Sequence, residues 1–294
     1  MRIVFIGTVE FSKKILEKLM SLKSDIAAVL TRKTSDFNSD FCDLSPLCKV
    51  HGIPFRYIDD INSEDTVEYI RKLKPEIIFC FGFSQMLSED ILNIPPMGVL
   101  GYHPAKLPKN RGRHPIIWAL TLGYTKTSST FLFLDKGVDN GDILNEKDVD
   151  ISYEDDARSL YDKITATALG QIEDFLPKLE KNKFEKHPQD QSKACYLRER
   201  GKQDGRINFN QNSRQIYNLV RALARPYIGA HIDYNGNEIK VWQAQETMFP
   251  CKETMPGTII DIKAKKVFVK CADNIIVLKK HGFKKLPKVG EVLV

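Results

Sequence analysis

Apolar residues follow two patterns along the chain. In the first part, short apolar runs alternate with amphipathic segments, and in the later part the pattern is that of a series of short strands. Residues 1–7 show little alternation between apolar and polar side chains and include β-branched ones, as expected of a strand buried on both faces. Residues 10–22 then place apolar side chains at helical spacing, at positions 11, 15, 16, 19, 20 and 22. A strand, a turn and a helix in this order predict the start of a doubly wound α/β sheet.

The same alternation continues to residue 179. We expect strands at 26–30, 76–81, 98–102 and 128–134, and helices near 44–50, at 64–73, after Ser88, at 114–122 and at 156–179. Residues 31–45 are polar and predict a loop. Ligands of open α/β sheets bind beyond the carboxyl ends of the strands, so residues 83–88 and His103 should share one rim.

A different pattern follows. Residues 181–205 are polar and charge-dense, with no apolar period, which predicts a linker. Residues 213–224 then predict a helix that Pro226 ends, and short strands are expected at 230–234, 239–244, 257–262, 266–271 and 275–279. Asn235-Gly236 predicts a hairpin turn. Short strands at this spacing are typical of a small β-barrel.

Length and composition favour a soluble, cytoplasmic protein of two domains. The chain has 294 residues and no window of about 18 uncharged apolar residues, which argues against a membrane span. The apolar run at the N-terminus is short and charged residues follow it, so we expect a first strand and not a secretory signal. The six cysteines show no CxxC pair and no nearby histidine at ligand spacing. Neither a metal site nor a disulfide framework is therefore indicated.

Charge is distributed unevenly along the chain. From Cys195 onward there are 18 Lys and Arg residues against 9 Asp and Glu, whereas the first 194 residues carry 26 against 29. A basic C-terminal part suits an anionic partner such as RNA or a nucleotide, although a solvated Lys-rich face is the commoner explanation.

Two stretches carry candidate chemistry. Residues 101–115 place His103 on a proline-punctuated, cationic loop after a strand, and residues 135–142 form a glycine-rich acidic turn that begins 32 residues after His103. A histidine and a carboxylate brought together from these stretches could handle protons. Each stretch also has a structural interpretation, because His103 could be a satisfied structural residue and the acidic turn an ordinary loop or a weak calcium loop.

Together the two stretches resemble the signature of the tetrahydrofolate-dependent formyltransferases. That signature reads Asn-x-His-x-Ser-Leu-Leu-Pro-x-x-Arg-Gly, followed by Asp-x-Gly-x-Asp-x-Gly, and His103 and Asp139 stand at its separation of 36 residues. Residues 2–11 are similar to the start of the methionyl-tRNA formyltransferases. Residues 77–87, 109–118, 204–209, 220–222 and 226–230 resemble more closely the formyltransferase domain that acts on UDP-aminoarabinose. The similarity covers almost the whole chain.

Pattern and resemblance together imply an α/β fold. We expect a Rossmann-like, doubly wound and mostly parallel sheet, followed by a small OB-like β-barrel. The expected domains are a formyltransferase catalytic domain over residues 1–185, a linker over 186–204, and a C-terminal helix with an OB-like β domain over 205–294.

The resemblance implies transfer of a formyl group from N10-formyltetrahydrofolate to a primary amine, without a metal or a covalent enzyme intermediate. Asp139 would take or share a proton of the substrate ammonium, and His103 would stabilise the oxyanion and relay a proton to N10. The folate would lie against two loops, at Phe83, Ser84, Met86, Leu87, Ser88, Asp135, Gly137, Val138 and Asp139.

Gly101 departs from the signature, which has Asn at this position. That amide normally donates to the oxyanion, and loss of one such donor typically lowers the rate by about 10²- to 10³-fold. Asn110, Asn140, a main-chain N–H or a water could replace it, or the substrate could need the space. The chain could also be a weak or inactive relative, but retained activity is favoured because His103, Asp139 and both folate loops are present.

A cationic group follows on the same loop, formed by Lys109, Arg111, Arg113 and His114. It could bind anionic groups of the substrate, because arginine suits bidentate contacts with phosphate or carboxylate. Alternatively, the loop is simply solvated and Arg111 with Gly112 determines the turn.

The expected acceptor is a small amino sugar, either nucleotide-linked or an acidic sugar. The alternative is methionyl-tRNA, which the basic C-terminal part favours. Against tRNA, residues 31–41, where the tRNA enzymes carry a basic loop, contain only Arg32 and Lys33 as cations beside Asp36 and Asp40. Barrel aromatics are also too sparse for a nucleic-acid stacking surface. A further alternative is a non-catalytic folate- or nucleotide-binding relative, and a homodimer is possible.

Overall fold

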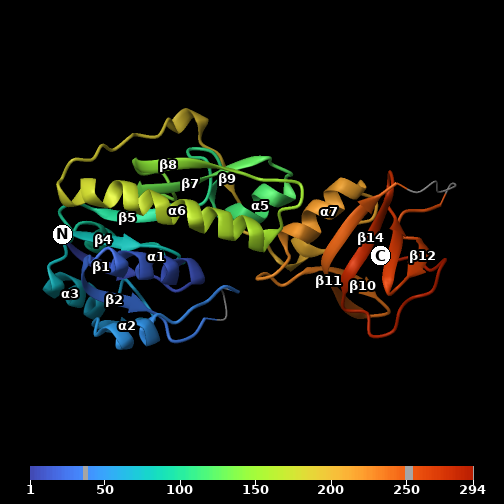
Figure 1. Cartoon of the computed structure of the whole chain (residues 1–294), viewed down its shortest axis with the longest axis horizontal. Coiled ribbons are helices and arrows are strands. Elements are labelled where there is room, and N and C mark those ends of the chain that lie inside the picture. The colour runs from blue at the N-terminus through green and yellow to red at the C-terminus, as the bar shows by residue number, and fades with distance from the viewer. Residues whose placement is uncertain (36–38, 249–253, 294) are drawn as a thin grey trace. The chain divides into compact units, whose positions relative to one another are not determined.

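The computed structural model describes residues 1–35, 39–248 and 254–293, and these divide into two units (Figure 1). The first unit contains Met1–Gly112, Thr127–Val149 and Lys163–Leu197, and the second contains Arg113–Lys126, Asp150–Asp162 and Arg198–Val294. Asp36, one of the acidic residues weighed against tRNA binding, lies outside the described residues.

A seven-stranded sheet organises the first unit, in the order β3-β2-β1-β4-β5-β7-β8. Its strands are β1 (Arg2–Ile6), β2 (Asp25–Thr31), β3 (Phe55–Tyr57), β4 (Ile77–Cys80), β5 (Val99–His103), β7 (Lys126–Phe133) and β8 (Ile143–Asp150). The pairs from β3 to β5 are parallel, and β7 runs antiparallel to β5. The expected doubly wound, mostly parallel sheet is therefore confirmed.

Helices cover both faces of this sheet. They are α1 (Glu10–Ser21), α2 (Ser45–His51), α3 (Glu64–Leu73), α4 (Glu89–Leu92) and α6 (Ala157–Glu180). Figure 1 shows α1 and α6 running along the strands, and aromatic side chains fill this layer: the rings of Phe11 and Tyr102 stack 4.3 Å apart and those of Phe131 and Phe175 meet at 4.9 Å. On the opposite face, Val67 of α3 belongs to an apolar cluster with strand residues such as Val4 and Ile78. Alternate strand side chains thus fill two separate cores.

The second unit contains a five-stranded antiparallel sheet, in the order β10-β11-β14-β13-β12, where a small barrel was expected. Its strands are β10 (Ala230–Tyr234), β11 (Asn237–Thr247), β12 (Ile259–Lys263), β13 (Lys266–Lys270) and β14 (Ile275–His281), and its helices are α5 (Pro115–Thr121) and α7 (Ser213–Ala222). Figure 1 shows α7 beside β11 and β14, against which it packs. Asn235 and Gly236 form the predicted hairpin turn, both with positive φ.

Some elements lack a clear sequence signal. β3 has only three residues, and β8 is polar and half exposed, so its apolar period is weak. Two further short strands pair with each other, β6 (Arg111–Gly112) and β9 (Tyr196–Leu197), and β9 lies inside the segment expected to be a linker. In the part of the chain that the structure describes, no helix is long and apolar enough to cross a membrane.

Candidate active site

His103 and Asp139 meet at the carboxyl end of β5. His103 is the last residue of β5 and only 4% exposed, while Asp139 lies on the loop between β7 and β8. The imidazole Nδ1 is 3.4 Å from the carboxylate Oδ2. The topology explains the contact, because β7 pairs directly with β5 and its following loop returns to the edge where β5 ends. The two expected catalytic side chains therefore lie side by side.

Main-chain groups complete the surroundings of this pair. The Nε2 of His103 donates to the carbonyl of Asn110 at 2.7 Å, and the amide N–H of Gly112 donates to Asp139 Oδ2 at 2.8 Å. Asn110 and Asp139 both have positive φ, 61° and 51°, a region that Asn and Asp tolerate better than most residues. The loop after β5 therefore holds both members of the pair.

The loop that carries Asp139 is shaped by its own side chains. The Gly137 N–H donates to Asp135 Oδ1 at 2.9 Å. The side-chain amide of Asn140 turns its NH₂ group toward the Gly137 carbonyl and Asp135 Oδ1 and donates to both. A Cβ on Gly141 would lie 1.9 Å from the carbonyl oxygen of Phe133, so the chain requires glycine there. The donors of the Asn140 amide are thus used within its own loop, so Asn140 does not replace the missing amide at position 101.

The second expected folate loop, residues 83–88, follows β4. Asn62 anchors it by donating to the Met86 carbonyl at 2.9 Å and accepting from the Ser88 N–H at 2.8 Å. Leu87 is buried, whereas Met86 is 53% exposed and Ser84 is also exposed. Because β4 and β5 are parallel neighbours, this loop and His103 lie at the same edge of the sheet.

Leu134 occupies the space beside Gly101. A Cβ built on Gly101 would lie 2.3 Å from Leu134 Cδ2 and 2.8 Å from its Cγ. A larger residue at position 101 therefore requires Leu134 to move. The glycine and the leucine form a matched pair, which gives the departure from the signature a physical basis.

Arg111 was expected among the residues that bind an anionic substrate, and its surroundings correct that expectation. The side chain is 1% exposed, and its guanidinium donates to the Oε1 of Gln189 at 3.1 and 2.7 Å, to Gln191 at 2.9 Å and to the Tyr196 hydroxyl at 3.0 Å. Its donors are used inside the protein, so the alternative interpretation, in which Arg111 determines the turn, is the one that the geometry favours.

Residues 189–197 hold the loop after β5, a role that the sequence analysis missed. Cys195 accepts from the Asn110 N–H through Sγ at 3.2 Å, and its carbonyl accepts from the Arg111 N–H at 3.0 Å. The segment is polar and aperiodic, so only its glutamines and tyrosine, which can pair with a buried guanidinium, could have signalled this role.

The other members of the cationic group have different surroundings from Arg111. Lys109 is exposed. Arg113 and His114 belong to the second unit, where Arg113 pairs with Glu199 at 3.3 Å and His114 Nδ1 accepts from the Arg200 N–H at 3.2 Å. Burial, reinforced by Arg113, lowers the pKa of His114. The four residues therefore do not form one solvated cationic cluster.

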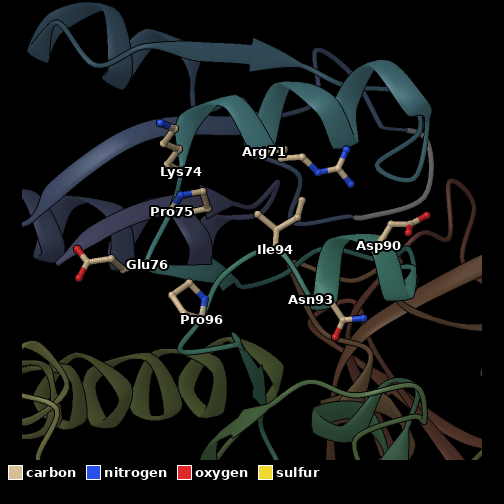
Figure 2. A pocket seen from close by; sticks show the side chains of 8 residues that line it. All are labelled: Arg71, Lys74, Pro75, Glu76, Asp90, Asn93, Ile94 and Pro96. Carbon is tan, nitrogen blue, oxygen red and sulfur yellow. The ribbon is translucent and has the colours of Figure 1, made fainter.

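A separate cavity of about 550 Å³ opens at the other edge of the sheet (Figure 2). Its lining combines charges of both signs, with Arg71 and Lys74 opposite Glu76 and Asp90. Glu76 directly precedes β4, so the cavity lies at the amino end of that strand, whereas His103 lies at the carboxyl end of β5. The cavity is distinct from the His103–Asp139 site.

Comparison with known proteins identifies the class. Residues 1–171 match the formyl transferase family and residues 200–289 match the formyl transferase C-terminal domain. The chain therefore belongs to the formyl transferase family, as the signature indicated.

Two relatives and one solved structure serve for comparison. The chain is 31% identical to a methionyl-tRNA formyltransferase of Geotalea daltonii over 98% of its own length and 93% of the relative. It is 36% identical to the bifunctional polymyxin resistance protein ArnA of Wigglesworthia glossinidia brevipalpis, over 72% of this chain but 32% of that protein. In fold it resembles an N-formyltransferase of Helicobacter canadensis, solved with folinic acid and dTDP-3-aminofucose, with a TM-score of 0.69, 18% identity, and coverage of 94% and 98% of the two chains.

Proposed function

We propose that this formyltransferase moves a formyl group from N10-formyltetrahydrofolate to a primary amine, with Asp139 and His103 handling the protons. The observation that carries the proposal is the 3.4 Å contact between these side chains at the carboxyl edge of the sheet. The reaction forms a bond from the amine nitrogen to the formyl carbon and breaks the bond from that carbon to N10. Over the whole reaction, one proton passes from the attacking amine to N10.

Asp139 is suited to receive a proton from the amine. Its Oδ2 accepts from Gly112 and faces His103, while Oδ1 has no hydrogen-bond partner among the described residues. A substrate ammonium directed at Oδ1 would lose its extra proton and be held for attack. Because the side chain is only 19% exposed, competing water has limited access to it.

His103 is suited to hold the proton that the departing folate needs. Its Nε2 already donates to a carbonyl, so Nδ1 and Oδ2 would face each other as two lone pairs unless a proton lay between them. That proton can pass to N10 as the tetrahedral intermediate collapses, and the second proton that the attacking nitrogen loses would then return to the imidazole. With Leu134 filling the space at Gly101, we assign the imidazole the further role of donor to the oxyanion.

Asp139→Asn tests the assignment. The variant keeps an oxygen for the Gly112 N–H but cannot take a proton, so we expect single-turnover formyl transfer to slow by about 10²- to 10⁴-fold. Folate release provides the measurement, and Asp142→Asn is the matched control, because the Asp142 carboxylate makes no hydrogen bond in the described structure. Unchanged transfer in Asp139→Asn would remove Asp139 from the reaction.

Methionyl-tRNA is the first acceptor to test. The Geotalea daltonii relative, 31% identical over nearly the full length of both chains, is a methionyl-tRNA formyltransferase, which supports tRNA better than the amino sugar that the sequence analysis placed first. The excess of Lys and Arg after Cys195 is also suited to a polyanion.

An amino sugar is the second candidate, and two observations favour it. Arg32, one of two cations in the segment where the tRNA enzymes carry a basic loop, donates to the Asp59 carbonyl at 2.9 Å and lies over the Phe83 ring, so it is not directed at an acceptor. The N-formyltransferase of Helicobacter canadensis, which shares the fold, was also solved with an amino sugar nucleotide, dTDP-3-aminofucose.

Measuring kcat/KM for both acceptors at several salt concentrations separates the candidates. A tRNA acceptor predicts a steep fall in kcat/KM, about 10³-fold or more between 50 and 200 mM salt if six or more phosphates are contacted. An amino sugar nucleotide carries few charges and predicts a shallow dependence. Transfer to neither acceptor would contradict both acceptor assignments.

A further inference from the structure

Gln189 connects the two loops of the active site through both halves of its amide. Its Oε1 accepts from Arg111 Nε and Nη2, and its Nε2 donates to the carbonyls of Asp139 at 2.8 Å and Gly141 at 2.7 Å. These four contacts use the full hydrogen-bonding capacity of a primary amide, in a side chain that is buried and 8% exposed. We propose that Gln189 is a positioning residue that sets the place of the Asp139 carboxylate.

The contacts form a closed ring. Arg111 binds Gln189, Gln189 binds the main chain of Asp139, Asp139 binds the N–H of Gly112, and Gly112 follows Arg111 in the chain. A loop held at its main chain on one side and at its side chain on the other cannot rotate Asp139 away from His103 without breaking the ring. The Asp139 backbone, with φ of 51°, is held in a conformation that needs such support.

Arg111 orients Gln189 from the other side. Its side-chain partners Gln189, Gln191 and Tyr196 are all neutral, and no carboxylate among the described residues lies within ion-pair distance of the guanidinium. A guanidinium can only donate, so it takes the oxygen and not the nitrogen of an amide as its partner. The charge therefore directs Gln189 Oε1 toward Arg111 and leaves Nε2 to face the Asp139 loop.

The two halves of the amide can be separated by substitution. Gln189→Glu keeps an oxygen acceptor for Arg111 and adds an ion pair, but it removes both N–H donors and turns a carboxylate oxygen toward two carbonyls. Gln189→Met removes both halves at similar volume. If Gln189 only satisfied Arg111, Gln189→Glu would behave like the wild type, whereas positioning of Asp139 requires both variants to fail.

Formyl transfer with saturating donor provides the first measurement, and this arm rests on the proposed function. We expect kcat to fall at least tenfold in Gln189→Glu and in Gln189→Met, with KM for the amine changed less than threefold. The matched control is Tyr196→Phe, which removes another acceptor of the Arg111 guanidinium, while the Tyr196 side chain makes no hydrogen bond to residues 135–142 in the described part of the chain. A wild-type kcat in Gln189→Glu would overturn the inference.

Hydrogen exchange of the peptide covering residues 135–142 is the second measurement, and it needs no activity. Exchange should quicken in both Gln189 variants and stay at the wild-type rate in Tyr196→Phe. If the wild type transfers no formyl group but exchange behaves as expected, the proposed function fails and the positioning role stands. Unchanged exchange in the Gln189 variants overturns the positioning role, whatever the activity.

Discussion

The pairing of Gly101 with Leu134 leads to a prediction that can be worked out in free energy. Gly101→Ala places a Cβ 2.3 Å from Leu134 Cδ2, and overpacking of this kind costs about 1–3 kcal/mol of unfolding free energy. Leu134→Ala removes apolar contacts at a partly buried position and should cost about 2 kcal/mol. If the two sites were independent, the double variant would lose about 4 kcal/mol.

The sites share the same space, so the double variant should lose less than the sum. We expect a coupling of about 1–3 kcal/mol in favour of the double variant, because the shortened side chain admits the new methyl group. Urea unfolding followed by circular dichroism gives the four free energies of the cycle. Gly170→Ala is the control for a glycine with space around it, and it should stabilise α6 by about 0.5–1 kcal/mol.

The same cycle can be extended to the reaction. Gly101→Asn in the Leu134→Ala background returns the amide of the family signature to a site with room for it. We expect single-turnover formyl transfer to rise at least tenfold over Leu134→Ala alone, because an added oxyanion donor is worth about 10²- to 10³-fold. Free energies that add within about 0.5 kcal/mol would refute the packing argument, and an unchanged rate would refute the assignment of the position.

Two further substitutions test the surroundings of the site. Gly141→Ala places a Cβ against the Phe133 carbonyl, beside the hydrogen bond that the Phe133 N–H donates to the main-chain carbonyl of Asp142 at 2.8 Å. Urea unfolding should therefore show that the free energy of unfolding falls by about 2–4 kcal/mol. A fall below about 0.5 kcal/mol would show that the loop adapts. Burial lowers the pKa of His114 from 6.5, so the unfolded chain binds a proton more readily than the folded one and stability falls as pH drops below about 6.5. In His114→Asn, the urea midpoint should decline less between pH 8 and about pH 5.5 than in the wild type. The remaining decline is due to His231, because burial lowers the pKa of that side chain as well. A decline as steep as in the wild type would contradict this.

Much of the fold could be predicted because its signals are local. α3 and β10 occupy the residues that periodicity predicted, and the turn at Asn235-Gly236 requires only that both residues tolerate positive φ. β3 and β8 lacked such a signal, because a very short strand and a polar, half-exposed strand have no apolar period to detect.

The candidate site also has one part that could be predicted from the sequence and one part that could not. The meeting of His103 with Asp139 could be predicted from the spacing of a recognisable signature, and the structure shows the two side chains at 3.4 Å. The burial of the Arg111 side chain could not be predicted, since an arginine on a polar loop has the same sequence context whether it faces solvent or is buried. Only the return of residues 189–197, about 80 positions later, shows that its guanidinium is enclosed.

Local sequence was sufficient for most of the helices, for the long apolar strands, for the proximity of His103 to Asp139 and for the family. Tertiary structure alone decided that Leu134 fills the space at Gly101, that Asn140 is committed to its own loop, and that Gln189 joins the two loops. The physical reason is the range of the interactions. Periodicity and turn preferences act between residues close in the chain, whereas burial, side-chain volume and the pairing of polar groups depend on which distant segments the fold brings into contact.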